Sequence, residues 1–105
     1  MVKQETIEAI HARFKANSPN EVWLDVRRPD EWAEGVIPGV KKIQLSGLED
    51  ALPELDPDKT YILICRSGNR SNRAGELMES KGFKDLVNFD GGMMKWYQAN
   101  YALAH

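Results

Sequence analysis

Cysteine and histidine are scarce in this sequence of 105 residues, which has one Cys, at position 65, and only two His. A single cysteine cannot form an internal disulfide, and two histidines beside it supply too few ligands for a structural zinc site. A chain of this length can bury enough apolar surface to fold without such a framework. We therefore expect no metal and no other cofactor.

Long apolar runs and an excess of positive charge are also missing. The apolar stretches are only a few residues long, far short of the roughly 20 residues that cross a bilayer, and the N-terminus lacks the apolar core of a signal peptide. Fourteen basic and sixteen acidic residues give a net charge of −2, which argues against a nucleic-acid or anionic-membrane surface. These absences predict a cytoplasmic protein without nucleic-acid or membrane partners, whose cysteine begins as a thiol.

The composition is that of an ordinary globular domain, with 42% hydrophobic and 29% charged residues. The length suits one domain, and neither a repeat nor a linker divides the chain, so we expect one domain over residues 1–105. No pattern in the sequence indicates the oligomeric state.

Strand and helix patterns alternate along the chain. Strands are predicted at 21–26, 40–45, 60–64 and 86–89. Helical patterns fall between and around them, at 7–17, 29–35 and 48–52, in a segment that ends at Gly82, and at 93–101. Such alternation favours an α/β fold with a mostly parallel sheet and helices on both faces. Ligands bind beyond the carboxyl ends of the strands in such folds, and Cys65 directly follows a strand.

The segment from Cys65 to Ser71 contains no aliphatic side chain, although it joins a very apolar strand to an amphipathic helix. Its backbone N–H groups and the first-turn donors of the helix are expected to surround the thiol. These donors, the helix dipole and nearby arginine charges would lower the pKa of the cysteine. We therefore predict a reactive, solvent-facing Cys65 rather than an inert buried thiol.

Activation of this thiol is expected without a histidine base. His11 lies on the first helix and His105 is the last residue, which disfavours a Cys–His pair, although a fold that brings His11 close stays an alternative. A thiolate stabilised only by backbone donors and cations suits a sulfur–sulfur bond better than a peptide bond. The sequence thus predicts sulfur transfer, in which Cys65 becomes a persulfide and passes the sulfur to a second thiol or another nucleophile.

Three arginines lie between positions 65 and 73 with no acid among them. Such a cluster attracts a small sulfur-containing anion, for example thiosulfate or polysulfide. Arg66 and Arg70 are the expected contacts because they lie within the loop, and their planar guanidinium groups suit an oxyanion. Arg73 lies one turn along the helix and is equally well explained as a solvated surface residue.

Three segments, in the right order, are similar to a known family. The loop Cys65-Arg66-Ser67-Gly68-Asn69-Arg70-Ser71 resembles the active-site loop of the single-domain rhodaneses, which are sulfurtransferases. An upstream signature and a closing one also match, through Leu24-Asp25-Val26-Arg27, Glu31-Trp32, Gly35-Val36-Ile37-Pro38-Gly39-Val40, and Asn88-Phe89-Asp90-Gly91-Gly92-Met93 with Trp96. Val36 and Val40 replace the usual His and Ala of the family, at positions that carry none of the expected chemistry.

The resemblance implies a small five-stranded parallel sheet flanked by helices. It implies that Cys65 is the persulfide-forming nucleophile and that a substrate-binding cradle is formed by Arg66, Ser67, Gly68, Asn69, Arg70 and Ser71. Asp25 and Arg27 resemble supporting residues near a strand end, and we interpret them as an ion pair that fixes the neighbouring loop. Gly91 and Gly92 are interpreted as a turn, and Trp96 as a core residue.

Two other functions stay open. Cysteine phosphatases and arsenate reductases use a similar loop with five residues between Cys and Arg, whereas only four separate Cys65 from Arg70. The shorter loop should hold one anionic sulfur better than a tetrahedral oxyanion. The other alternative is a persulfide carrier or interaction module that receives sulfur from a partner protein or passes it to one, which the sequence separates poorly from an enzyme.

Overall fold

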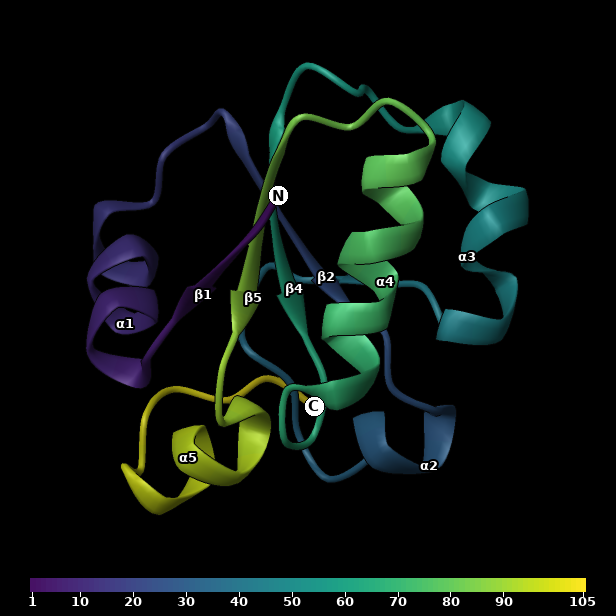
Figure 1. The fold of residues 1–105 in the computed structure, drawn as a ribbon. Helices are drawn as coiled ribbons and strands as arrows, with labels where there is room; N and C mark the ends of the chain where they lie inside the picture. Colours follow the sequence, from purple (N-terminus) through teal and green to yellow (C-terminus); the bar gives the residue numbers. More distant parts are fainter.

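The most apolar segment of the chain forms the centre of the sheet in the computed structural model, which describes residues 1–105. Every residue of this strand, β4 (Thr60–Ile64), is buried. The other strands are β1 (Val2–Glu5), β2 (Glu21–Asp25), β3 (Lys41–Lys42) and β5 (Asp85–Phe89). Their order is β1-β5-β4-β2-β3, and all neighbouring pairs are parallel (Figure 1).

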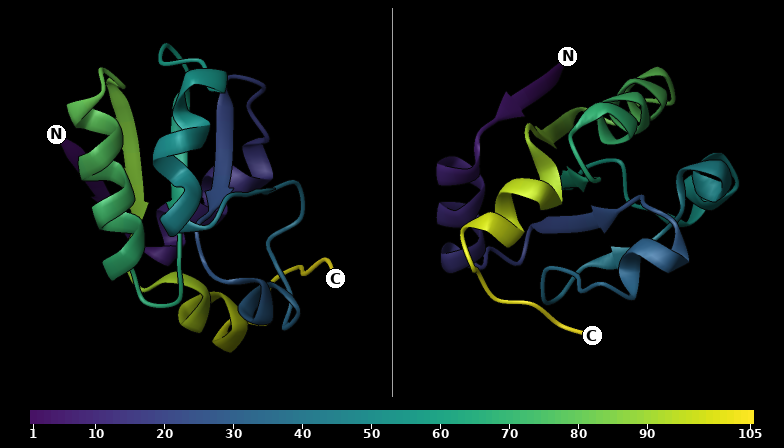
Figure 2. Two further views of the ribbon diagram at one scale, coloured as in Figure 1. Left: turned by 90° about the vertical axis from the view of Figure 1, so that its right-hand side faces the viewer. Right: turned by 90° about the horizontal axis from the view of Figure 1, so that it is seen from below.

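Helices cover both faces of this sheet, as Figures 1 and 2 show. They are α1 (Ile7–Ala16), α2 (Pro29–Trp32), α3 (Leu45–Ala51), α4 (Asn69–Ser80) and α5 (Gly92–Gln98). Side chains alternate along β4, so Tyr61 and Leu63 pack in the cluster on the α3 and α4 side. Ile62 and Ile64 pack on the opposite side, with Trp96 of α5. The predicted α/β fold is therefore confirmed, including five parallel strands and Trp96 as a core residue, which is fully buried.

The N-terminal strand was not among the strands that the residue pattern predicts. The β1 strand has a single aliphatic residue, Val2, and lies at the edge of the sheet, paired only with β5. An edge strand with polar, exposed side chains has no hydrophobic alternation to reveal it, since it forms through backbone pairing.

The strand predicted at 40–45 is shorter than expected, which is a correction to the sequence-based assignment. Only Lys41 and Lys42 form regular β3, and Leu45 already begins α3. The segment still follows the end of β2, because the N–H of Ile43 donates to Asp25 and that of Leu45 donates to Val26. Early entry into the helix lets Leu48 reach the core, where it is fully buried.

Two of the helices, α2 and α5, lie at the end of the sheet toward which the strand arrows point (Figure 1). At that same end, the chain leaves β4 and turns into α4. The carboxyl ends of the strands therefore carry a ring of short loops and helix starts, as the strand and helix alternation predicts. None of the helices combines the length and apolar character needed to cross a membrane.

Candidate active site

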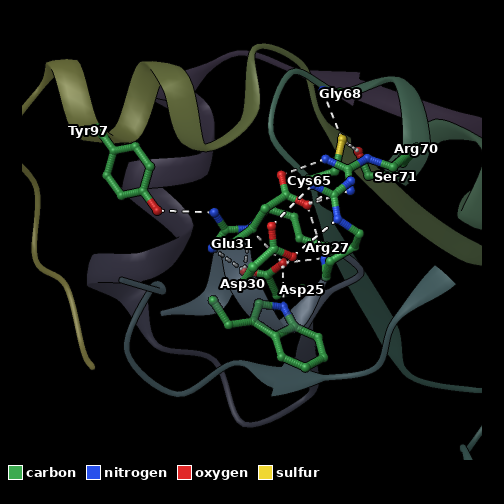
Figure 3. Close-up of polar contacts among 11 residues, drawn as sticks. Asp25, Arg27, Asp30, Glu31, Cys65, Gly68, Arg70, Ser71 and Tyr97 are labelled. Carbon is green, nitrogen blue, oxygen red and sulfur yellow. Dashed lines mark hydrogen bonds and ion pairs between the residues drawn. The ribbon is translucent and has the colours of Figure 1, made fainter. Parts of the chain in front are cut away.

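Cys65 directly follows β4, and its sulfur lies against the start of α4 (Figure 3). The chain turns there through Gly68, whose φ of +110° is left-handed and suits glycine. This turn brings the N–H of Gly68 to 3.0 Å from Sγ of Cys65. The hydroxyl of Ser71, in the first turn of α4, lies 3.3 Å from the same sulfur. The expected group of donors around the thiol is thus present.

These donors change the acidity of the thiol. Burial alone would raise the pKa of Cys65, but hydrogen bonds from the Ser71 hydroxyl and from the backbone N–H groups of Ser71, Gly68 and Ser67 outweigh it. The pKa of Cys65 is therefore lowered from its ordinary value, in the direction that the sequence predicts. The dominant cause is hydrogen bonding rather than the charge of a single arginine.

The expectation that Cys65 faces solvent is wrong, because the residue is only 1% exposed. Side-chain alternation explains the difference: Tyr61, Leu63 and Cys65 all point to the α4 side of the sheet and join one apolar cluster. The loop then closes over the sulfur instead of presenting it. The thiolate is stabilised within the fold, and a reagent must enter the loop to reach it.

The beginning of α5 fixes the loop after Cys65 through backbone hydrogen bonds. The N–H groups of Gly91, Met93 and Met94 donate to three consecutive carbonyls of the loop, those of Ser67, Cys65 and Arg66, at 3.1, 2.9 and 3.1 Å. With these carbonyls held by α5, the amides of the loop are free to turn toward the sulfur.

Gly92 is needed for this close approach. A Cβ at position 92 would lie 2.5 Å from the carbonyl oxygen of Cys65 and 2.6 Å from that of Arg66. Sequence reasoning assigned Gly91 and Gly92 only to a turn and missed this contact. The match of both glycines to the closing signature was the signal that could have indicated it.

Arg70 does not stand free in the structure, in contrast to the arginine cluster without acids that the loop sequence shows. Its two terminal nitrogens donate to the two carboxylate oxygens of Glu31 on α2, at 2.7 and 2.8 Å (Figure 3). The Arg70 hydrogen bonds lower the pKa of Glu31 to about 2. The sequence indicated Glu31 only as part of the upstream signature and did not predict that it lies beside Arg70.

The predicted ion pair between Asp25 and Arg27 is present and buried, with Nη2 of Arg27 2.8 Å from the carboxylate. Burial alone would lower the pKa of Arg27, but hydrogen bonds to Asp25 and Tyr97 outweigh it and raise the pKa. Arg27 also donates to the carbonyl of Gly35, at 3.0 Å, and Trp32 donates to Asp25, at 3.1 Å. The pair thus ties both ends of the α2 segment to β2, and α2 carries Glu31.

The remaining predicted residues lie on the outside of the loop. Arg66, Ser67 and Asn69 are exposed, as is Arg73 on α4. Neither Arg66 nor Arg73 forms an ion pair. Arg66 is therefore an exposed cation of the loop without an ion-pair partner, and it can bind an anion from solvent.

The Cys–His alternative is not supported by the fold. His11 packs with aromatic residues on the α1 and α5 side of the sheet, where its ring stacks on Tyr101 at a centroid distance of 3.6 Å. Cys65 points to the opposite side. The donors on the sulfur are hydroxyl and backbone groups, and no imidazole is among them.

Comparison with known proteins places these features in a family. The family profile described as "Rhodanese-like domain" matches residues 6–99. "Putative sulfurtransferase YtwF" of Bacillus subtilis is 38% identical over 96 residues, which cover 90% of each chain. "Thiosulfate sulfurtransferase GlpE" of Pseudomonas syringae is 32% identical over 75 residues, which cover 71% of each chain.

A longer relative and a solved structure extend the comparison. "Putative sulfur carrier protein YrkF" of Bacillus subtilis is 40% identical over 95 residues, but this chain spans only about half of its length, 51%. The crystal structure of a rhodanese-related protein from Thermoplasma volcanium superposes with a TM-score of 0.84 and 29% identity, covering 97% of both chains.

Proposed function

This chain belongs to the family of rhodanese-like domains, and we propose that it is a sulfurtransferase that moves sulfane sulfur from thiosulfate or polysulfide to a thiol or cyanide. Cys65 carries the sulfur as a persulfide. The observation that supports this most is the pair of donors on its sulfur, the N–H of Gly68 and the hydroxyl of Ser71, with a lowered thiol pKa and no histidine beside it. The thiosulfate sulfurtransferase among the relatives supports this class of donor.

The first step is attack by the Cys65 thiolate on the outer sulfur of the donor. A bond forms between Sγ and that sulfur, while the sulfur–sulfur bond inside thiosulfate breaks and its electron pair leaves with sulfite. The total charge is unchanged, and no oxidant is required. The negative charge of the resulting persulfide lies on its terminal sulfur, which the backbone N–H groups of residues 66–71 can receive.

The second step returns the enzyme to its starting state. An acceptor thiolate or cyanide attacks the terminal sulfur, the new bond forms, and the electron pair of the broken bond returns to Sγ of Cys65. The donors that lowered the pKa of the cysteine now stabilise it as a leaving group. The same hydrogen bonds therefore assist both halves of a ping-pong cycle.

Binding of the anionic donor is assigned to the two arginines of the loop, with different roles. Arg66 is exposed and unpaired, so it attracts the donor without losing another partner. Arg70 is held by Glu31, so its charge is already balanced and it contributes mainly by keeping the cradle in shape. The side chains of Ser67 and Asn69 are exposed on the outside of the cradle.

Entry of the donor requires movement of the loop, because Cys65 is almost completely buried. Arg66 and Ser67 are exposed, whereas Gly68 is buried, so opening involves Arg66 and Ser67 and breaks the hydrogen bonds between their carbonyls and the start of α5. Since Cys65 is the only cysteine, the rate of its alkylation by iodoacetamide in the native protein measures this opening. Complete resistance to alkylation at neutral pH would contradict the proposal.

Mass spectrometry of the intact protein tests the transfer itself. The protein is incubated with thiosulfate and, separately, with polysulfide. We expect the mass of one added sulfur atom, which cyanide or a thiol reductant removes, and release of sulfite from thiosulfate. The Cys65→Ser variant is the control and should gain nothing. A wild-type protein that takes up no sulfur from either donor, while remaining folded, contradicts the function.

The carrier alternative is favoured by one specific observation, the similarity to a sulfur carrier protein twice as long as the matched segment. A carrier would load from a donor and keep its persulfide until a partner arrives. Single-turnover loading followed by steady-state assays with cyanide and small thiols separates the two functions, because an enzyme turns over repeatedly and a carrier stops after one sulfur. An aryl phosphate in the same assay tests phosphatase activity, which we expect to be absent.

A further inference from the structure

Ser71 lies between two acceptors, although its hydroxyl has only one proton to donate. Its Oγ is 3.3 Å from Sγ of Cys65 and 2.5 Å from Oδ1 of Asn88 on β5. Ser71 is fully buried and Asn88 is 2% exposed, so both residues are shielded from bulk solvent. The sulfur and the amide oxygen therefore compete for one hydrogen.

The amide of Asn88 is fixed in the orientation that makes it a competitor. Its nitrogen donates to the carbonyl of Gly68, at 3.1 Å, and to Oε1 of Gln4 on β1, at 2.8 Å. A backbone carbonyl can only accept, so the nitrogen must face Gly68 and the oxygen must face Ser71. Rotating the amide by half a turn would place two oxygens against each other.

The two protonation states of Cys65 use the Ser71 proton differently. In the thiol state, the S–H can donate to Oγ of Ser71, and the Ser71 hydroxyl donates to Asn88, so every buried group has a partner. In the thiolate state, the Ser71 hydroxyl must turn to the sulfur, and the oxygen of Asn88 then loses its donor. A buried acceptor without a partner is costly, so Asn88 opposes ionisation of the thiol.

We propose that Asn88 is a positioning residue that sets the resting protonation state of Cys65 by holding the Ser71 hydroxyl proton away from the sulfur. The inference deepens the proposed function, on which its catalytic meaning rests. The backbone N–H groups stabilise the thiolate, and Asn88 limits how far that stabilisation goes. The resting cysteine thus stays less ionised, and less open to oxidation, than its ring of donors alone would make it.

This competition also favours the persulfide over the free thiolate. Once Sγ is bonded to the outer sulfur, the charge lies on that outer sulfur and Sγ no longer needs the Ser71 proton. The hydroxyl returns to Asn88, and both partners are satisfied again. Loading of Cys65 therefore relieves an unpaired acceptor that the thiolate creates.

The charged groups around this network are the same in the wild-type protein and in the uncharged variants below, whereas Asn88→Asp adds one carboxylate. They come from the loop, α4, α2 and the ends of β2 and β5: Arg66, Arg70, Glu31, Asp25, Arg27 and Asp90. Arg70 is paired with Glu31, and Arg27 with Asp25. Ser71 and Asn88 are uncharged, so a change of the thiol pKa in Asn88→Leu reports on the shared proton.

Two substitutions of Asn88 test the proposal because they should act in opposite directions. Asn88→Leu keeps the branched shape but removes the competing oxygen, and should lower the thiol pKa by about one unit, a roughly tenfold gain in the thiolate-to-thiol ratio at a fixed pH. Asn88→Asp provides a stronger, anionic acceptor and should raise the pKa by at least as much. A merely structural role of Asn88 would weaken the loop in both variants and shift the pKa the same way.

The pKa is read from the ultraviolet absorbance of the thiolate as a function of pH, with Cys65→Ser subtracted as background. Gln4→Ala is the matched control, since it removes an outer partner of Asn88 without touching Ser71, and it should leave the pKa unchanged. In a Ser71→Ala background, the shift caused by Asn88→Leu should vanish, because no hydroxyl remains to be shared.

Three results would overturn the proposal: shifts of the same sign in both Asn88 variants, an unchanged pKa in both, or a shift from Asn88→Leu that persists without Ser71. If Asn88→Leu does not fold, Asn88→Asp decides through the Ser71→Ala background: a shift that shrinks there supports the shared proton, and a shift of the same size there, as charge repulsion alone would give, overturns the proposal. None of these measurements uses a sulfur donor. A protein that shows the shifts but transfers no sulfur refutes the proposed function and leaves the role of Asn88 intact.

Discussion

Replacing Gly92 by alanine tests whether the start of α5 positions the loop that carries Cys65. The new methyl group would lie 2.5 Å from the carbonyl oxygen of Cys65 and 2.6 Å from that of Arg66. Carbon and oxygen need more than 3 Å between them, so the loop or the helix must move by several tenths of an ångström. The atoms that must move belong to the backbone that directs donors at the sulfur.

The expected effect has two parts. A non-glycine residue in the left-handed region, where Gly92 has a φ of +54°, costs roughly 1–2 kcal/mol, and forced overlap in a packed region costs roughly 1–3 kcal/mol more. The free energy of unfolding should therefore fall by about 2–5 kcal/mol. Weakening one hydrogen bond to the thiolate should also raise the pKa of Cys65 by about one unit.

Gly82→Ala is the matched control for this substitution. Gly82 also has a positive φ, +95°, but a Cβ there would meet no atom within 4 Å. It shares the backbone strain and lacks the clash, so its loss of stability should be only about 1–2 kcal/mol with an unchanged thiol pKa. Urea unfolding measures the stability of both variants, and thiolate absorbance measures the pKa.

Equal behaviour of the two variants would refute the reasoning. If Gly92→Ala loses no more stability than Gly82→Ala and keeps the wild-type thiol pKa, the contact between α5 and the loop does not control the sulfur. A loss of stability without a pKa change would limit the role of α5 to packing.

Three further predictions concern the ion pairs and the free arginine. Because the pKa of Glu31 is lowered from 4.5 to about 2, the stabilisation by its charge is present above about pH 4.5 and disappears as the pH falls toward 2. Glu31→Gln should reduce the free energy of unfolding, measured with urea, by roughly 2–3 kcal/mol at neutral pH and by little at about pH 2.5. A reduction that does not depend on pH would contradict this. Arg66→Ala should raise the KM for thiosulfate up to about fivefold with little change in kcat, whereas Arg73→Ala should change neither; equal effects of both would refute the assignment of Arg66. Asp25→Asn leaves Arg27 buried without a counter-charge and should reduce the free energy of unfolding by about 3–5 kcal/mol, measured with urea, while a loss below 1 kcal/mol would show that the pair is not structural.

Local patterns were enough to locate the candidate site in this chain. The strand 60–64 is rich in large hydrophobic residues, the loop after it is polar, and Gly68 allows the turn that aims an N–H at the sulfur. Each of these properties depends on neighbours in the sequence, so the carboxyl end of β4, the position of Cys65 beside it and the lowered direction of its pKa could be predicted. The β1 strand could not, since its polar edge carries no periodic pattern.

The sequence by itself therefore determined where the proposed nucleophile lies, which backbone groups surround it and that the sheet is parallel, because these follow from residues adjacent along the chain. Only the tertiary structure decided which distant side chains contact the loop and how deeply Cys65 is buried. Glu31 reaches Arg70 across 39 positions, and Asn88 reaches Ser71 across 17, because β2 and β5 both lie beside β4 and end at the same edge of the sheet. Burial of Cys65 has the same origin: side-chain direction relative to the helix layers is a property of the assembled sheet and is absent from the loop sequence.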